Sequence, residues 1–178
     1  MLNLKLYIYH LHQDDPKKCT AIKLYKFKLV RLVKNPKLIP KFAIVLNPYA
    51  NKILIPLDKK LIEDNGLIAI DCSWNKIHEA FKKHFKGINK RLPFLLAANP
   101  VNYGKLGKLS SAEALASALY IVNYKKEAEK ILSLFKWGET FLTLNKNPLE
   151  DYSKAKCEEE ILKLEKEYFG EISLTNNI

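Results

Sequence analysis

The amino-acid sequence predicts an α/β fold, with a mainly parallel sheet in the first half and helices in the second. Three observations support this prediction. Several runs in the first half are apolar on both faces and alternate with helical stretches, as the buried strands of a parallel sheet do. Asn-Pro and Asn-Gly signals, which favour turns, end these runs. The second half carries apolar residues at helical spacing almost throughout.

The N-terminal segment is predicted to form a strand and then either a helix or a second strand. LKLYIYHL, residues 4–11, is aromatic and partly alternating, which is typical of a strand. A loop follows, in which Pro16 interrupts any regular ladder. AIKLYKFKLVRLV, residues 21–33, alternates lysine with apolar residues and fits either a strand or a short helix.

The next two predicted strands both end in unusual residues. KFAIVLNPY, residues 41–49, is a near-continuous apolar run closed by an Asn-Pro turn. A short helix at about 57–64 stops at Asn65-Gly66. A strand then runs into Asp71 and the sequence DCSW.

The rest of the chain is predicted to be helical, apart from one more apolar run. Residues 75–86 have helical spacing with lysines on the outer face, and the apolar run 91–98 is interpreted as a third buried strand. Ser110 and Glu113 fit the S-x-x-E capping box at a helix start. Further helices are expected in 125–135, 139–152 and 157–169, before an end predicted to fray. We expect an α/β domain at 1–92 and a mainly helical domain at 93–178.

The net charge of +11 is unevenly distributed along the chain. Residues 1–41 hold ten Lys and Arg against two acids, and residues 76–108 hold eight against one. From Glu139 onward, five basic residues face nine acidic ones. A basic surface favours a polyanion such as nucleic acid through counterion release. The alternative is the lysine-rich solvation of heat-stable proteins.

The cysteines and the N-terminus predict a reduced, cytoplasmic protein that crosses no membrane. The three cysteines are far apart and form no CxxC pair. No apolar run reaches the roughly 18 residues that a membrane span needs, and the N-terminus lacks a signal-peptide layout. His10, His12 and Cys19 match the spacing rules for zinc poorly, so no metal is expected.

Three predicted strand ends indicate a ligand pocket. LNP at 46–48, DCSW at 71–74 and AANPVNYG at 97–104 each follow an apolar run. The carboxyl ends of parallel strands share one edge of a sheet, where ligands bind. Neither a dinucleotide fingerprint nor a phosphate-binding loop is present. At this edge Asp71 either takes part in chemistry or caps the following helix.

Several motifs closely resemble those of the archaeal and eukaryotic small-subunit ribosomal RNA aminocarboxypropyltransferases. They are DPKKCTAIKL at 15–24, DCSW at 71–74, RLPFLLAANPVNYGKLGKLSSAEALASALYI at 91–121 and FKWGETFLTLN at 135–145. The resemblance implies a fold like that of the knotted SPOUT methyltransferases, with a deep trefoil knot in the N-terminal half. It also implies transfer of the 3-amino-3-carboxypropyl group of S-adenosyl-L-methionine to N3 of a modified uridine, possibly an N1-methylated pseudouridine, during ribosome biogenesis.

The resemblance assigns roles to individual positions. Asp71 matches the aspartate thought to assist the reaction. Side chains or backbone that contact the cofactor are implied at Leu46, Pro48, Ile70, Trp74, Leu95, Leu109, Ser110, Ser111 and Ala112. Lysines and arginine that flank this pocket are the candidates for phosphate contacts: Lys17, Lys18, Lys23, Lys82, Lys83, Lys86, Lys90 and Arg91.

The expected partner is small-subunit ribosomal RNA or the pre-ribosomal subunit. A monomer is expected, since the helical second half covers the surface that knotted methyltransferases use to dimerise. Two alternatives stay open at this point. One is an rRNA methyltransferase of the same SPOUT class, which would share fold and cofactor. The other is a ribosome-assembly factor that binds rRNA without catalysis.

Overall fold

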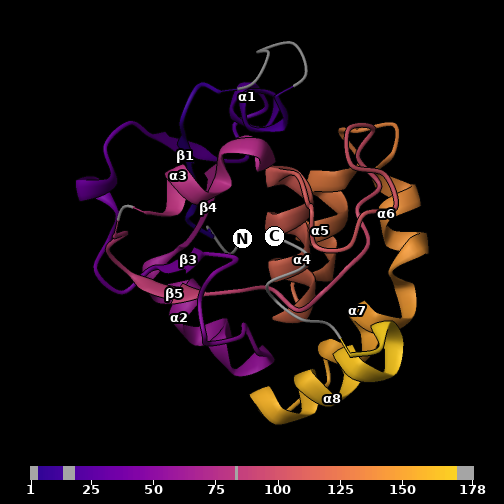
Figure 1. The fold of residues 1–178 in the computed structure, drawn as a ribbon. Helices are drawn as coiled ribbons and strands as arrows, with labels where there is room; N and C mark the ends of the chain where they lie inside the picture. The colour runs from indigo at the N-terminus through magenta and orange to yellow at the C-terminus, as the bar shows by residue number, and fades with distance from the viewer. Residues whose placement is uncertain (1–3, 14–18, 83, 172–178) are drawn as a thin grey trace.

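The first half of the chain forms a five-stranded parallel sheet, as predicted (Figure 1). The computed structural model describes residues 4–13, 19–82 and 84–171. The strand order is β2-β1-β4-β3-β5, and every neighbouring pair is parallel. The strands are β1 Leu6–His10, β2 Arg31–Val33, β3 Ile44–Leu46, β4 Leu67–Asp71 and β5 Ile88–Lys90.

Helices occupy most of the second half, and shorter ones connect the strands of the first. The α-helices are α1 Thr20–Lys26, α2 Lys59–Asn65, α3 Ile77–Phe81, α4 Ser111–Ile121, α5 Lys125–Leu132, α6 Gly138–Leu144, α7 Lys146–Tyr152 and α8 Glu158–Phe169. Three 3₁₀ turns, η1 Pro36–Leu38, η2 Pro56–Asp58 and η3 Trp74–Lys76, complete the described elements. Within the described residues no helix is long and apolar enough to cross a membrane.

The sheet is apolar on both faces because each face has its own cover. Ile8 and Leu67 belong to a large core that continues into the helical half, where α4 packs against β4. Tyr9 and Ile68, one position further along the same strands, belong to a smaller core that includes Phe85. Successive strand residues point to opposite faces, so this arrangement requires the continuous apolar runs seen in the sequence.

Two ambiguous or long segments resolve into shorter elements. Residues 21–33 contain both of the predicted alternatives, since most of α1 and then β2 lie within them. The helix predicted over 75–86 is wrong in length, because the regular helix α3 covers only five residues after a 3₁₀ turn. The frayed end predicted for the last six residues lies outside the described part of the chain.

The third apolar run is not a strand of the sheet, which corrects the sequence interpretation. Residues 91–98 make only isolated bridges, between Ile53 and Arg91 and between Leu96 and Leu106. Both backbone groups of Leu96 are bonded to the buried Asn145 side chain, whose Oδ1 accepts from Leu96 N and whose Nδ2 donates to Leu96 O, each at 2.8 Å. Asn145, which lies between α6 and α7, therefore takes the bonds that a neighbouring strand would have made. The edge strand is β5 instead.

Candidate functional site

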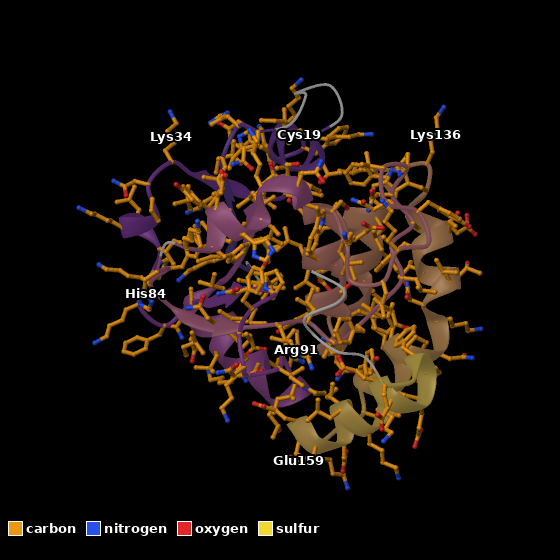
Figure 2. The ribbon with its side chains drawn as sticks, in the orientation of Figure 1. Cys19, Lys34, His84, Arg91, Lys136 and Glu159 are labelled. Carbon is orange, nitrogen blue, oxygen red and sulfur yellow. The ribbon has the colours of Figure 1, made fainter. Side chains whose placement is uncertain are left out.

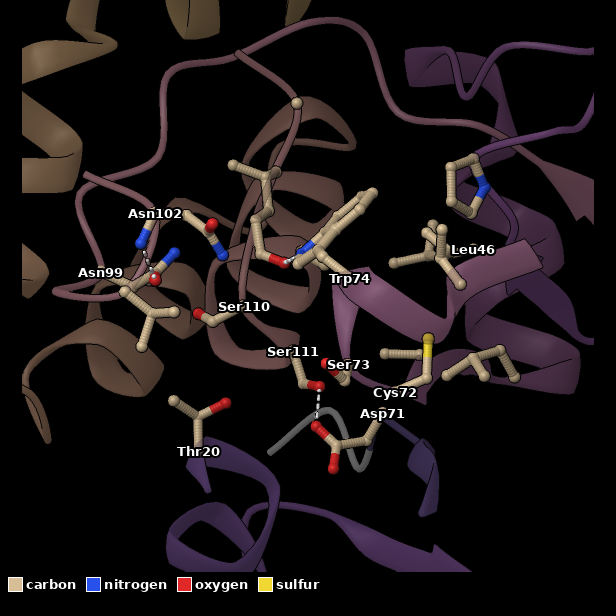
Figure 3. A pocket seen from close by; sticks show the side chains of 18 of the residues that line it. Thr20, Leu46, Asp71, Cys72, Ser73, Trp74, Asn99, Asn102, Ser110 and Ser111 are labelled. Atoms are coloured by element: carbon tan, nitrogen blue, oxygen red, sulfur yellow. Dashed lines mark hydrogen bonds between the residues drawn. The ribbon is translucent and has the colours of Figure 1, made fainter. Parts of the chain in front are cut away.

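A cavity of about 1020 Å³ lies where β3, β4 and the start of α4 meet (Figure 3). Leu46 is the last residue of β3 and Pro48 follows it, while Asp71 is the last residue of β4 and Trp74 follows it. The loop before α4 and α1 supply further lining residues. The predicted position, at the carboxyl edge of a parallel sheet, is therefore where the structure has its large cavity.

Seven of the nine implied cofactor-contact positions line this cavity, namely Leu46, Pro48, Ile70, Trp74, Leu109, Ser110 and Ser111. The Trp74 indole donates from Nε1 to Leu109 O at 3.0 Å, which fixes the ring against the loop before α4. Leu95 and Ala112 are fully buried and are not among the lining residues. The structure therefore does not place these two residues at the cavity surface.

The start of α4 is held by the predicted capping box. Ser110 Oγ accepts from Glu113 N at 3.2 Å, and Glu113 Oε2 accepts from Ser110 N at 2.7 Å. Glu113 also accepts from Ala98 N and from both nitrogens of Asn99, so one fully buried carboxylate joins the helix start to the loop at 98–99. These bonds hold Asn99 and Ser110, which line the cavity, in place. Ala112 N donates to Thr20 Oγ1 at 3.4 Å, which ties α1 to the same helix end.

Asp71 sits in a buried cluster at the cavity. Ser111 donates to Asp71 Oδ1 at 2.5 Å, as Figure 3 shows, and the Cys19 thiol donates to Oδ2 at 3.4 Å. His10 Nε2 lies 3.1 Å from the same oxygen. All four residues are buried. The carboxylate thus contacts β1, α4 and the N-cap residue of α1. These contacts take the place of the predicted alternative, in which Asp71 caps the following helix.

His10 and Cys19 are site residues that the sequence-based site list lacks. Burial, and next the negative charge of Asp71, raise the pKa of Cys19 to about 11, so its thiol stays protonated and donates to the carboxylate. Cys19 lies within the DPKKCTAIKL motif of the resemblance, which assigned it no role, and His10 and Cys19 otherwise appeared only in a weak metal-ligand pattern. Neither spacing nor periodicity relates them to Asp71, which lies 52 residues beyond Cys19.

The same cluster contains donor types that bind metals. Ligand atoms of His10, Cys19 and Asp71 lie within 4.8 Å of one another, whereas His12 packs its ring edge-on against His10 instead. A metal ion would bind the thiolate of Cys19, whereas burial raises the pKa of the metal-free thiol. Hydrogen bonding accounts for the contacts of Cys19 with its neighbours. The expected absence of a metal stays a prediction.

The predicted phosphate contacts separate into three groups: exposed residues, residues outside the described part of the chain, and buried residues. Lys23, Lys82 and Lys86 are exposed, and Lys23 lines the cavity mouth. Lys17, Lys18 and Lys83 lie outside the described residues. The exposed lysines stay candidates for contacts with a polyanion.

Lys90 and Arg91 are buried and paired with acids, which argues against the prediction that they contact phosphates, although Arg91 also lines the cavity. Lys90 Nζ donates to both oxygens of Asp58, at 2.7 and 2.8 Å. Arg91 makes a bidentate pair with Glu165, at 2.7 and 2.9 Å. All four residues are buried, so these charges are neutralised inside the protein. In Figure 2 Arg91 lies near the centre of the view, whereas Lys34 and Lys136 project beyond the outline of the ribbon.

Comparisons with known proteins match almost the whole chain. A family model described as ribosome biogenesis protein, C-terminal, matches residues 44–169. A second, described as a possible Fer4-like domain in RNase L inhibitor, matches residues 4–38. Those residues contain a single cysteine, Cys19, too few for a ferredoxin-type cluster held by four thiolates.

Curated relatives share nearly half of their residues with this chain. The 16S rRNA aminocarboxypropyltransferase of Methanocaldococcus jannaschii is 49% identical over 92% of this chain and 95% of its own length. The enzyme of the same name from Methanosphaera stadtmanae is 49% identical over 94% and 98%. A solved structure described as the SAM-dependent rRNA:acp-transferase Tsr3 from Vulcanisaeta distributa is 41% identical with a TM-score of 0.89, covering 99% of this chain and 94% of that one.

Proposed function

Because the chain belongs to the family of 16S rRNA aminocarboxypropyltransferases, we propose that it transfers the 3-amino-3-carboxypropyl group of S-adenosyl-L-methionine to small-subunit rRNA. The family relationship carries the proposal, and one structural observation supports it in particular. A buried carboxylate, Asp71, faces a cavity of about 1020 Å³ between an indole wall and a capped helix start.

The reaction proposed is a substitution at a carbon of the cofactor's sulfonium. A bond forms between N3 of a uridine and the γ-carbon of the methionine chain, and the bond from that carbon to sulfur breaks. 5′-Methylthioadenosine leaves with the electron pair. Any of the three carbons on sulfur could be attacked, so the group transferred depends on which carbon faces the acceptor.

Apolar and aromatic residues suit the cofactor's adenine and methyl groups. We assign the adenine to the wall formed by Leu46, Pro48 and Trp74, all of which line the cavity. An aromatic face also attracts the sulfonium cation. The cofactor's carboxylate is assigned to the start of α4 at Ser110 and Ser111, where the helix dipole favours an anion.

Asp71 is proposed to orient the acceptor base and to accept the proton that N3 loses. General bases must lie within hydrogen-bond reach of the proton they remove, and Asp71 lines the cavity with the reactants. Ser111, Cys19 and His10 hold the carboxylate from three sides. A side chain fixed in this way loses little entropy on reaching the reactive geometry.

Finer features of the proposal follow the family resemblance. The acceptor is proposed to be an N1-methylated pseudouridine, and the N-terminal half is proposed to contain the deep trefoil knot of the SPOUT class. We likewise propose that the protein is a monomer and is cytoplasmic. Its α/β domain is proposed to end at residue 92 and its helical domain to begin at residue 93. Phosphates are assigned to Lys17, Lys18, Lys23, Lys82, Lys83 and Lys86. The non-consecutive neighbours β1–β4 and β3–β5 are compatible with a threaded chain.

Isotope labelling tests the proposed reaction. The protein is incubated with small-subunit rRNA and cofactor labelled either in the methyl or in the carboxyl carbon. Label should enter the RNA only from the carboxyl position. Entry from the methyl position would instead support the methyltransferase alternative. Calorimetry with S-adenosylmethionine tests the assembly-factor alternative, since a scaffold without catalysis should show no specific uptake.

A further inference from the structure

A second aromatic feature of the cavity has no part in the transfer chemistry described above. Phe135 and Trp137 lie in the turn between α5 and α6 and line the same cavity as Asp71. Their rings stack, with centroids 4.8 Å apart and planes inclined by 26°. Both side chains are half-buried, so each keeps surface that a ligand can contact. They come from the FKWG segment, to which the resemblance assigned no role.

The position of this aromatic pair is tightly fixed. Gly138 follows Trp137, and a Cβ at Gly138 would lie 2.0 Å from Leu132 O, so only glycine fits. From the other side, Lys23 of α1 donates from Nζ to Leu134 O at 2.5 Å. The same ammonium group lies 4.9 Å from the centroid of the Phe135 ring. A rigid turn and a bridging lysine therefore present the two rings to the cavity.

The surroundings of the pair favour an anionic ligand with a flat ring. Lys23 and Lys26 of α1 also line the cavity, and both are exposed. Pockets for a single drug-sized ligand hold roughly 300–1,000 Å³. At about 1020 Å³, this cavity lies at the upper end of that range, as expected if a second group binds beside the cofactor.

We propose that Phe135, Trp137, Lys23 and Lys26 form the subsite for the acceptor nucleotide. The target base leaves the RNA strand and stacks on the aromatic pair, as bases read by proteins from single-stranded RNA commonly do. The two lysines pair with the flanking phosphates. This inference rests on the proposed function, because it takes the acceptor to be a nucleotide of RNA.

The two tryptophans allow the cofactor wall and the acceptor subsite to be observed separately. The chain contains only Trp74 and Trp137. In Trp74→Phe, fluorescence reports on Trp137, and in Trp137→Phe it reports on Trp74. The probes are oligouridylate, inorganic polyphosphate and S-adenosylhomocysteine. We expect oligouridylate to quench Trp137, polyphosphate to leave it unchanged because it has no base, and S-adenosylhomocysteine to change Trp74.

Two outcomes of the fluorescence experiment would overturn the subsite. One is unchanged Trp137 emission at saturating oligouridylate. The other is an equal change with polyphosphate or with S-adenosylhomocysteine, which would assign the pair to phosphate or to the cofactor. Both variants keep an aromatic side chain and are checked for folding by circular dichroism.

Affinity measurements provide a second test. Trp137→Leu should weaken oligouridylate binding roughly tenfold, the size of one stacked base, with the Kd for S-adenosylhomocysteine unchanged. Lys26→Gln should reduce the salt dependence of RNA binding by about one phosphate, whereas Lys126→Gln, an exposed lysine of α5, should not. Equal effects of the two lysine variants would contradict the subsite.

Failure of the subsite can be told apart from failure of the proposed function. The wild-type protein is assayed in parallel with carboxyl-labelled cofactor and rRNA. Normal transfer of label with unchanged Trp137 emission overturns the subsite alone. Quenching of Trp137 by RNA without any transfer supports the subsite and overturns the proposed reaction.

Discussion

Three of the buried carboxylates, Glu113, Glu165 and Asp71, lie in two regions of the molecule, and their partners differ in kind. The first region, which we call the frame, contains Glu113 and Glu165. Glu113 accepts four hydrogen bonds from backbone and amide N–H groups, and Glu165 accepts three, two of them from Arg91. At the cavity, Asp71 contacts a hydroxyl, a thiol and an imidazole. The frame carboxylates are saturated by strong donors that do not titrate, whereas the partners of Asp71 are weak donors or can exchange protons.

This difference indicates which buried carboxylate is available to take part in the reaction. A carboxylate that is fully bonded to backbone N–H groups or to arginine stabilises a fold and has no capacity left for a substrate. A carboxylate held by side chains that can donate or release a proton can change its bonding during a reaction. Removing the charge should therefore affect activity in one region and stability in the other.

The largest expected effect is on the activity of Asp71→Asn. Loss of a general base or of a base-orienting carboxylate should lower kcat roughly 10²–10⁴-fold. The free energy of unfolding should change by about 1 kcal/mol or less, since the Ser111 hydroxyl and the Cys19 thiol can rotate and accept from the new amide. Label transfer and urea unfolding measure the two quantities, with Asp64→Asn, an exposed residue of α2, as the matched control. Full activity in Asp71→Asn would show that Asp71 is only structural.

A large effect is also expected for Glu165→Gln, but on the free energy of unfolding instead of on kcat. The substitution leaves the buried Arg91 guanidinium without its counter-charge, which should cost about 3–5 kcal/mol. Urea unfolding measures the loss. Glu167→Gln, at an exposed position two residues along α8, should change stability by about 0.5 kcal/mol at most. A small loss in Glu165→Gln would mean that Arg91 finds water or another partner, and that Arg91 is available to RNA after all.

Glu113→Gln tests the frame carboxylate nearest to the cavity. An amide presents an NH₂ group to donors that need an acceptor, so the loss of stability should be about 1–3 kcal/mol. The loop at 98–99 and the start of α4 both depend on Glu113, so cofactor affinity should also fall. Calorimetry with S-adenosylmethionine measures the second effect. Unchanged stability together with lost activity would place Glu113 with Asp71 rather than with Glu165.

The exposed lysines should have a smaller effect, confined to RNA. Lys82→Gln and Lys86→Gln should each weaken rRNA binding by a few fold and lower its salt slope by about 1. Cofactor affinity should not change. Filter binding at several salt concentrations provides the measurement. Lys34→Gln, an exposed lysine next to β2, serves as the comparison.

The smallest effect is expected for Glu150, a carboxylate that is neither buried nor at the cavity. Hydrogen bonds from Lys125, and then from Tyr120, lower the pKa of Glu150. A lowered pKa in the folded state adds stability above the usual range of a glutamate, and this stability is lost as the pH falls. Glu150→Gln should cost at most about 1 kcal/mol at neutral pH, because the pair is partly exposed, and nothing in acid. Chemical unfolding at pH 7 and at pH 3 measures both values.

Much of this molecule could be predicted from local sequence. The apolar runs predicted a parallel sheet, because strands covered on both faces need apolar residues at every position. The S-x-x-E pattern predicted the start of α4, because a capping box involves residues only three positions apart. The pocket at the ends of β3 and β4 followed from the parallel sheet itself.

Only the tertiary structure decided which charged and polar residues meet. Lys90 and Arg91 belong to a basic run in the sequence, yet their partners are 32 and 74 residues away and bury them. Cys19 likewise contacts Asp71, 52 residues further along the chain, only because the fold brings the two side chains together. A local pattern determines backbone conformation and apolar faces, because those depend on neighbouring residues. The role of a charge depends on what the folded chain places beside it, and no local pattern contains that information.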